Sequence, residues 1–304
     1  MKRVQVKLIF EKEGHVKMKN FALIIKIVAA VVIGLFVGRV ITPLFGLESP
    51  LASFAISTSI AIALLVIIEG IMSQLAKGKT KIIPMGVLEN LHKVKKNEIS
   101  KATLVLADAF KEDPLFKTLF GDAARNSYKY TLVAKFMLRY CHKYGDVYAT
   151  SENFEGIMAI TQDEYTYTTL WRLIRSGSIF PFLGIGFKSF VKVAGALSPI
   201  DEVRKKQMKN KSFAYIQIIG VASENQGKGH GGKLLRALIA MTDEVKLPIY
   251  LETETESNVR LYERFGFKTL EKMALPVINQ PMWTMIRAVK VDKEKDETSR
   301  DGDI

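Results

Sequence analysis

The sequence predicts an α/β fold preceded by two membrane-spanning helices, on three observations. A β-branched and aromatic run from Tyr215 to Val221 leads directly into a glycine-rich turn, and apolar residues at helical spacing follow that turn. Two apolar segments, each long enough to cross a bilayer, stand near the start of the chain. The 304 residues, 48% of them hydrophobic, suffice for one sizeable core and a smaller unit.

The first quarter of the chain, residues 21–72, predicts a transmembrane helical hairpin. Phe21 to Thr42 and Leu51 to Ile71 are 22 and 21 residues long, and a spanning helix needs about 20 apolar residues. A short connection with two prolines, Pro43 to Pro50, joins them. A cleaved signal peptide and a buried core hairpin are the alternatives.

The distribution of basic residues predicts the orientation of this hairpin. Lysine and arginine are frequent in residues 1–20 and in the linker 73–86, whereas the connection holds only Glu48. Both termini and the domain that follows the linker are therefore expected in the cytoplasm, next to the lipid bilayer. Gly34 to Gly38 form a G-x-x-x-G motif, which fits hairpin packing, a homodimer or chance. Met18 is a second candidate for the start of the protein.

The remainder of the chain divides into a domain at residues 87–290 and a charged tail at 291–304, which is expected to be disordered. Before the glycine turn, the expected elements are helices at Asn97 to Phe110 and Asn126 to Tyr144, and strands at Val147 to Thr150 and Gly156 to Ile160.

The net charge and the cysteine and histidine residues limit the classes of partner, metal and compartment that can be expected for this protein. The net charge of +13 suits nucleic acid, an anionic membrane or anionic ligands. Its basic residues are spread over linker and flanks, so no nucleic-acid partner is expected. The single Cys141 excludes an internal disulfide and fits a reducing compartment. No metal is expected, because the histidines lack metal-ligand spacing; they are His15, His92, His142 and His230.

The glycine-rich turn between Val221 and Lys233 predicts a binding site for a phosphate group. Glycines let a ligand approach the backbone, and the free N–H groups of the following helix favour an anion. A Walker P-loop is excluded because Leu234 stands where Ser or Thr is needed after Gly232-Lys233. A dinucleotide fingerprint fits better, with Glu252 lying 20 residues after Gly232. Only 72 residues follow Gly232, however, too few for the further βα units of that fold.

The turn Gln226 to Gly231 resembles the Q/R-x-x-G-x-G/A turn of the GCN5-related N-acetyltransferases (GNATs). The resemblance continues in register. Pro248 to Thr253 is similar to that family's next strand, Asn258 to Phe267 to its N-x-x-x-Y-E-x-x-G-F helix and turn, and Met282 to Met285 to its closing strand. It covers Tyr215 to Arg287 well and extends more weakly back to about Val87.

The resemblance implies a GNAT fold, with a central mixed, mostly antiparallel sheet flanked by helices. It also implies an acyl-CoA-dependent N-acyltransferase of class EC 2.3.1. Such an enzyme transfers the acetyl group of acetyl-CoA directly, in a ternary complex, to a small-molecule or peptide amine. The residues implied for acetyl-CoA binding are Ile219, Val221, Gln226, Gly227, Lys228, Gly229, His230, Gly231, Gly232, Lys233 and Asn258.

Catalytic roles follow from the same resemblance. Tyr262 is the expected general acid, on the same helical face as Asn258. An N–H of Val221 or its neighbour is expected to stabilise the oxyanion where the family's fourth and fifth strands splay apart. The sequence does not identify the general base: the candidates are Glu252, Glu254 and Glu256 near the end of the fifth strand, with Glu252 preferred, and the alternative for all three is a solvated loop edge. The alternative is structural: Tyr262 packs in the core and Asn258 caps its helix.

Two further questions stay open at the level of sequence. Trp171 to Leu197 combines basic and apolar residues between the third and fourth strands. It either shapes the acceptor site, lies at a lipid interface, or forms ordinary core. The protein as a whole has one rival interpretation, a non-catalytic membrane-tethered module of the same fold that senses acyl-CoA or binds a partner.

Overall fold

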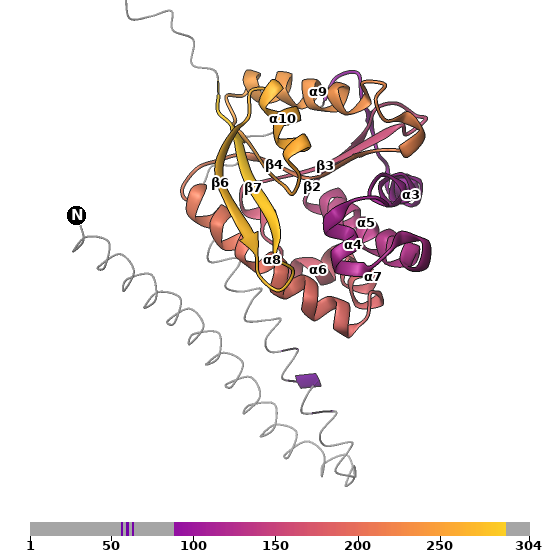
Figure 1. Ribbon diagram of the computed structural model, residues 1–304. Helices are drawn as coiled ribbons and strands as arrows, with labels where there is room; N and C mark the ends of the chain where they lie inside the picture. Colours follow the sequence, from indigo (N-terminus) through magenta and orange to yellow (C-terminus); the bar gives the residue numbers. More distant parts are fainter. Residues whose placement is uncertain (1–55, 57–58, 61–62, 64–87, 290–304) are drawn as a thin grey trace, which may run out of the picture. The chain divides into compact units, whose positions relative to one another are not determined.

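The computed structural model describes residues 56, 59–60, 63 and 88–289 of the chain, and residues 88–289 form an α/β unit (Figure 1). Among the described residues, no helix combines the length and the apolar character that crossing a bilayer requires. The predicted hairpin at 21–72 lies outside the described residues apart from those four positions, which are helical. The linker 73–86 and the tail 291–304 lie outside them entirely, so these expectations stay predictions.

A seven-stranded sheet runs through the described domain in the order β1-β2-β3-β4-β5-β7-β6. Its strands are β1 (His92–Lys93), β2 (Gly145–Ala149), β3 (Gly156–Gln162), β4 (Ala214–Val221), β5 (Ile249–Thr253), β6 (Lys268–Leu275) and β7 (Gln280–Arg287). Every neighbouring pair is antiparallel except β4 and β5, which are parallel. The prediction of a mixed, mostly antiparallel sheet is therefore confirmed.

Eight α-helices of the described domain accompany the sheet, together with three 3₁₀ turns. The helices are α3 (Ile99–Ala109), α4 (Pro114–Phe120), α5 (Ala123–Tyr144), α6 (Leu170–Ser176), α7 (Ile179–Gly184), α8 (Phe187–Gln207), α9 (His230–Glu244) and α10 (Glu256–Arg264). The turns are η1 (Lys96–Glu98), η2 (Asp163–Thr166) and η3 (Ser223–Asn225). The two predicted helices correspond to α3 and α5, and the two predicted strands to β2 and β3.

Helix α4 is not among the predicted elements, although the residues at its start are typical of a helix N-terminus. The Asp113 side chain accepts a hydrogen bond from the Phe116 backbone N–H at 2.8 Å, and Pro114 occupies the first helical position. Aspartate as N-cap followed by proline is a frequent helix start. Helix α4 carries Phe116, one of the residues that line the cavity of the candidate active site.

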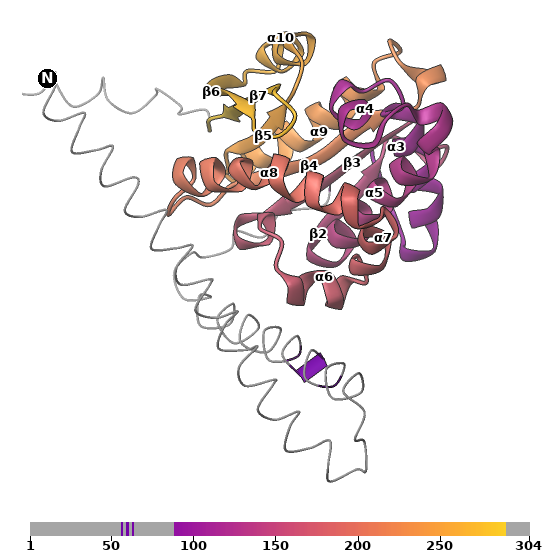
Figure 2. The same cartoon turned by 60° about the horizontal axis from the view of Figure 1, so that its bottom comes forward.

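Helices lie against opposite faces of the sheet (Figures 1 and 2), and an apolar layer holds them on each face. Side chains alternate along β3, as a strand requires. Met158 and Ile160 pack in the cluster that includes Leu234 and Leu238 of α9, and Ile157 and Ala159 in the cluster that includes residues of α3 and α5. A sheet covered on both faces reads as a continuous apolar run, as β3 does.

The functional geometry comes from the way β4 and β5 diverge. They pair only at Ala214 with Ile249 and at Tyr215 with Tyr250. Beyond Tyr215, β4 continues to Val221 paired with β3 alone, while β5 continues to Thr253 paired with β7. The predicted splay between the fourth and fifth strands is thus confirmed, and one backbone edge of β4 is left open.

Candidate active site

A cavity of about 450 Å³ lies where β4 and β5 diverge, and it brings together residues that are far apart in the sequence. Strand β4 contributes Tyr215 to Ile219, strand β5 and the residue after it contribute Leu251 to Glu254, and α10 contributes Asn258 and Tyr262. The opposite walls come from α4, α5, α8 and the end of α3. Four of the sequence-predicted site residues, Ile219, Glu252, Asn258 and Tyr262, therefore meet at one cavity.

The open edge of β4 presents backbone groups toward this gap. Ala222 N–H donates to the Glu155 carbonyl at 2.9 Å, so the backbone of Ala222 faces β3. Backbone groups alternate along an antiparallel pair, which turns those of Val221 and Ile219 away from β3. Consistently, the Val221 carbonyl accepts a hydrogen bond from Gln226 Nε2 at 3.2 Å. An extended ligand can therefore add to this edge as another strand would.

The glycine turn begins directly after β4 and the short η3 turn, and α9 starts within it at His230. Gly227 and Gly229 have φ of +76° and +87°, and a Cβ added at either would meet nothing within 4 Å. A Cβ added at Gly231 would lie 3.7 Å from Val221 Cγ2, so the turn adjoins the end of β4. The result is an exposed backbone loop at a helix N-terminus, an arrangement that favours an anion.

The basic side chains of the turn have internal partners. Lys228 Nζ donates to Asn225 Oδ1 at 3.3 Å, and Lys233 Nζ donates to the Thr150 carbonyl at 2.7 Å. Lys233 therefore ties α9 to the end of β2. Its predicted part in binding acetyl-CoA would require that contact to be shared or broken.

Asn258 and Tyr262 lie one turn apart in α10, and both line the cavity. The helix cap is Thr255, whose Oγ1 accepts from the Asn258 backbone N–H at 3.3 Å, so the Asn258 side chain is not the cap. The Tyr262 side chain is buried, and its hydroxyl has no hydrogen-bond partner among the described residues. Burial, followed by the nearby charge of Glu254, raises the pKa of Tyr262 above its ordinary value. The phenol therefore keeps its proton at neutral pH.

Glu252 is held in place by two donors. Arg204 Nη1 donates to its Oε1 at 2.8 Å, and the Tyr215 hydroxyl donates to its Oε2 at 2.6 Å. Arg204 also contacts Asp201, and its guanidinium carbon lies 4.3 Å from the centre of the Tyr215 ring. Since both oxygens of Glu252 are engaged, this carboxylate is poorly placed to accept a proton from a substrate.

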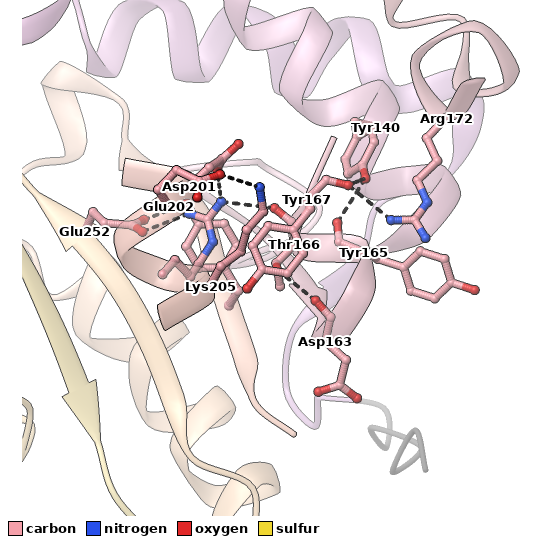
Figure 3. Close-up of polar contacts among 12 residues, drawn as sticks. Tyr140, Asp163, Tyr165, Thr166, Tyr167, Arg172, Asp201, Glu202, Lys205 and Glu252 are labelled. Atoms are coloured by element: carbon pink, nitrogen blue, oxygen red, sulfur yellow. Dashed lines mark hydrogen bonds and ion pairs between the residues drawn. The ribbon is translucent and has the colours of Figure 1, made fainter. Parts of the chain in front are cut away.

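The same polar cluster fixes the chain after β3, which forms another wall of the cavity (Figure 3). The Tyr140 hydroxyl contacts the carbonyls of Tyr165 and Tyr167, each at 3.0 Å. Arg204 Nη2 donates to the Thr166 carbonyl at 3.2 Å. Thr166 itself lines the cavity, so these buried side chains set the shape of its wall.

Glu254 and Glu256 occupy very different surroundings. Glu254 lines the cavity, and its pKa is raised from 4.5 to about 8, first by burial and then by the charge and hydrogen bonding of Asp113. Glu256 is exposed at the start of α10, with Arg260 at 3.7 Å and Lys272 at 3.9 Å. Of the three carboxylates considered from the sequence, Glu254 is the one poised to exchange a proton near neutral pH.

Two charged residues of the site, Arg204 and Asp113, are not predicted by the sequence analysis. Arg204 stands in a run of charged residues that is typical of a solvated helix end, and nothing in that run indicates its burial. Asp113 was recognisable as a helix cap, but not as the neighbour of Glu254. Both act through partners that are distant in sequence, so no local pattern could have identified them.

The segment from Trp171 to Leu197 forms α6, α7 and the first half of α8. Val193, Ala194 and Leu197 line the cavity. Leu173, Ile185 and Ala196 are buried in apolar clusters, whereas Phe180, Leu183 and Val191 are exposed. The segment therefore combines a cavity wall, ordinary core and an exposed apolar surface, and its parts at an acceptor site and at a lipid interface stay predictions.

Comparison with known proteins gives this geometry a class. Residues 191–269 match the family described as the acetyltransferase (GNAT) domain. The chain is 26% identical over 216 residues to a Schizosaccharomyces pombe protein named as an uncharacterized N-acetyltransferase, covering 68% of this chain and 87% of that protein. With the strand order above, these matches support a GNAT acetyltransferase domain in this chain and an acyltransferase enzyme at the general level.

Solved structures that are similar to this chain, each with a TM-score below 0.5, include three further proteins. One is described as histone acetyltransferase HPA2 and related acetyltransferase from Corynebacterium glutamicum (17% identity, TM-score 0.47, 67% of this chain and 98% of that chain). The others are a polyamine N-acetyltransferase from Drosophila melanogaster (12%, 0.46, 66% and 99%) and a putative arylalkylamine N-acetyltransferase from the mosquito Aedes aegypti (13%, 0.49, 66% and 87%).

Proposed function

We propose that the protein transfers the acetyl group of acetyl-CoA directly to the amine of an acceptor bound in the cavity between β4 and β5. The observation that carries this proposal is that the candidate binding and catalytic residues meet at one cavity. Asn258, Tyr262 and Glu254 surround one cavity beside the open edge of β4, and an anion-binding glycine turn follows that same strand.

Acetyl-CoA fits the described residues in two places. Its pyrophosphate would lie on the N–H groups of the turn around Gly227 and Gly229, where the space that a Cβ would fill is empty. Its pantetheine arm would add to the open edge at Ile219 and Val221. The Asn258 side chain would then contact the arm from α10.

The acceptor half of the cavity favours an amine with an apolar body. Phe116, Phe136, Met137, Val193 and Leu197 contribute to its wall. The charged lining residues are one arginine and three carboxylates: Arg204, Asp201, Glu252 and Glu254. Since Asp201 and Glu252 already contact Arg204, the lining has a negative balance, which suits one ammonium group and disfavours an anionic acceptor.

The reaction then follows from the placement of Glu254 and Tyr262. Ionised Glu254 removes a proton from the acceptor ammonium, directly or through a water. The amine nitrogen attacks the thioester carbonyl, and a backbone N–H of Val221 or its neighbour donates to the oxyanion that forms. When the C–S bond breaks, Tyr262 gives its proton to the coenzyme thiolate. The attacking nitrogen still carries a second proton to lose; it passes this proton to the Tyr262 phenolate, directly or through a water, and Glu254 releases its own proton to solvent.

We also propose that residues 21–72 anchor the domain at residues 87–290 in a membrane, with both termini and the active site in the cytoplasm. The lengths of the two apolar segments and the surplus of lysine and arginine at their outer ends support this part of the proposal.

The proposed function is tested by acetyl-CoA turnover with the purified full-length chain. Release of free coenzyme A thiol is measured with phenethylamine, octylamine, spermidine and a lysine-containing peptide, and the products are identified by mass. We expect N-acetylated product with the two apolar monoamines. Tight binding of acetyl-CoA with no turnover of any amine would instead indicate a sensing module.

The glycine turn gives a second test. Gly229→Ala is expected to raise the KM for acetyl-CoA about tenfold and to change kcat less than about twofold, because a Cβ at positive φ strains the turn by roughly 1 kcal/mol and crowds the bound phosphate. Steady-state kinetics measure both constants. Gly186→Ala is the matched control, since Gly186 also has a positive φ (+85°) and free space around it but lies outside the turn. Equal KM values for the two variants would contradict phosphate binding at Gly229.

A further inference from the structure

Charge is segregated over the helices that flank the acceptor side of the cavity. No aspartate or glutamate occurs in residues 123–145, which contain α5, or in residues 165–200, which contain α6, α7 and most of α8. Basic residues are frequent in both stretches, and all but the buried Arg172 are at least partly exposed: Arg125, Lys129, Lys135, Arg139, Lys143, Arg172, Arg175, Lys188 and Lys192. Proteins with a merely solvated surface usually intersperse both signs of charge, so this distribution points to an anionic partner.

These two stretches lie side by side in space. Helix α5 contacts α6 and α7, and α7 also contacts α8. Both views show α5, α6 and α7 grouped together, away from α9 and α10 (Figures 1 and 2). The stretches without acidic residues therefore belong to neighbouring helices of one part of the domain.

Large apolar side chains are exposed among these basic residues. The exposed fractions are 71% for Phe180, 62% for Leu183 and 51% for Val191, and Ile174 reaches 41%. Arg175 and Lys188 are exposed beside them. We call these six residues the α6–α8 face: Ile174, Arg175, Phe180, Leu183, Lys188 and Val191.

We propose that the α6–α8 face binds the surface of an anionic lipid bilayer. Phe180 and Leu183 would enter the boundary between headgroups and acyl chains, while Arg175 and Lys188 would contact the lipid phosphates. Exposed aliphatic and aromatic groups beside basic residues are typical of interfacial helices. A nucleic acid would use the basic residues but would leave the aliphatic side chains without partners. The inference depends neither on the transmembrane hairpin nor on acetyl transfer.

Helix α8 links this face to the cavity. Val191 and Lys188 stand on the face, and Val193 and Leu197, further along the same helix, line the cavity. Docking of the face on a bilayer would bring the acceptor side of the cavity close to the lipid surface.

A fluorescent label at position 180 tests the proposal. Phe180→Cys is labelled with nitrobenzoxadiazole in the full-length chain, where burial of the native Cys141, which also raises the pKa of its thiol, is expected to protect it from the label. The chain is mixed with, or reconstituted into, vesicles of phosphatidylcholine alone or with about one third phosphatidylserine. We expect the emission to shift to the blue and to rise at least twofold with the anionic vesicles only. High salt should reverse the change, because the contacts are surface charges.

Two controls separate this face from general membrane proximity. The same label at Arg260→Cys, an exposed site on α10, should stay unchanged in both vesicle types. In the label-180 chain, Arg175→Glu with Lys188→Glu should weaken the response about tenfold or more, since each basic residue near an anionic surface contributes several-fold. Arg264→Glu with Lys268→Glu makes the same change in charge on exposed residues elsewhere and should have no effect.

Three results would overturn the inference. The first is no shift at position 180, or an equal shift with neutral vesicles. The second is a shift with duplex RNA or DNA that anionic vesicles do not produce. The third is a shift that depends on protein concentration without any vesicle, which would show that the face is covered by a second copy of the chain.

Discussion

Tyr262→Phe is expected to lower kcat by about 10²–10⁴ while the KM for acetyl-CoA and the fold change little. The variant removes one hydroxyl that lines the cavity and has no hydrogen-bond partner among the described residues. No internal contact is therefore lost, and the free energy of unfolding should stay within about 0.5 kcal/mol of the wild-type value. What is lost is the proton for the departing thiolate, because the raised pKa of this phenol keeps it protonated.

A matched control is Tyr250→Phe. Tyr250 is also buried, but it packs against Phe213 and Tyr215, and its hydroxyl donates to Gln207 Oε1 at 2.9 Å. This variant should lose about 1 kcal/mol of stability and keep its kcat. Single-turnover thiol release and thermal unfolding of both variants separate the two effects. A wild-type kcat for Tyr262→Phe would remove the general acid from the mechanism.

The parts of the site that could be predicted from the sequence are those that local pattern determines. The glycine turn, the helix that starts in it, and the one-turn spacing of Asn258 and Tyr262 are each encoded within a dozen residues. Positive φ and helical periodicity leave direct traces in composition. The splay of β4 from β5 required the family resemblance as well, since strand pairing is not a local property.

The choice among the glutamates could not be made from sequence for a physical reason. Glu252 and Glu254 stand two residues apart at the end of one strand and are indistinguishable by local pattern. They differ because Arg204, 48 residues away, engages Glu252, while Asp113, from the start of α4, adds negative charge beside Glu254. Desolvation and charge pairing set the pKa of a carboxyl, and both depend on tertiary contacts. The preference for Glu252 as base rested on position alone.

Glu254→Gln is expected to lower kcat/KM for an alkyl-ammonium acceptor by about 10²–10⁴, because the base that removes its proton is gone. In the wild-type protein, kcat/KM should rise with pH up to about 8, the pKa of Glu254, as the carboxylate forms. The variant should lack that step. An acceptor whose own pKa lies well below 7 is already neutral when it binds, so the substitution should cost far less with it. An equal loss with both acceptors would show that Glu254 serves positioning rather than proton transfer.

The stability of Glu254→Gln then distinguishes a loss of proton transfer from a loss of folding, because the raised pKa of Glu254 fixes the direction in which stability should change with pH. The folded-state pKa of Glu254 lies at about 8, above its ordinary value of 4.5. A carboxyl with a raised pKa contributes stability that is fully present below pH 4.5 and is lost as the pH rises through 8. Glutamine stays neutral throughout, so Glu254→Gln should unfold at a higher temperature than the wild-type protein above pH 8 and at a similar one in acid. The raised pKa that lets Glu254 act as a base near neutral pH would therefore lower the stability of the folded protein at high pH. A variant less stable than wild type at pH 8.5 would contradict this account of its environment.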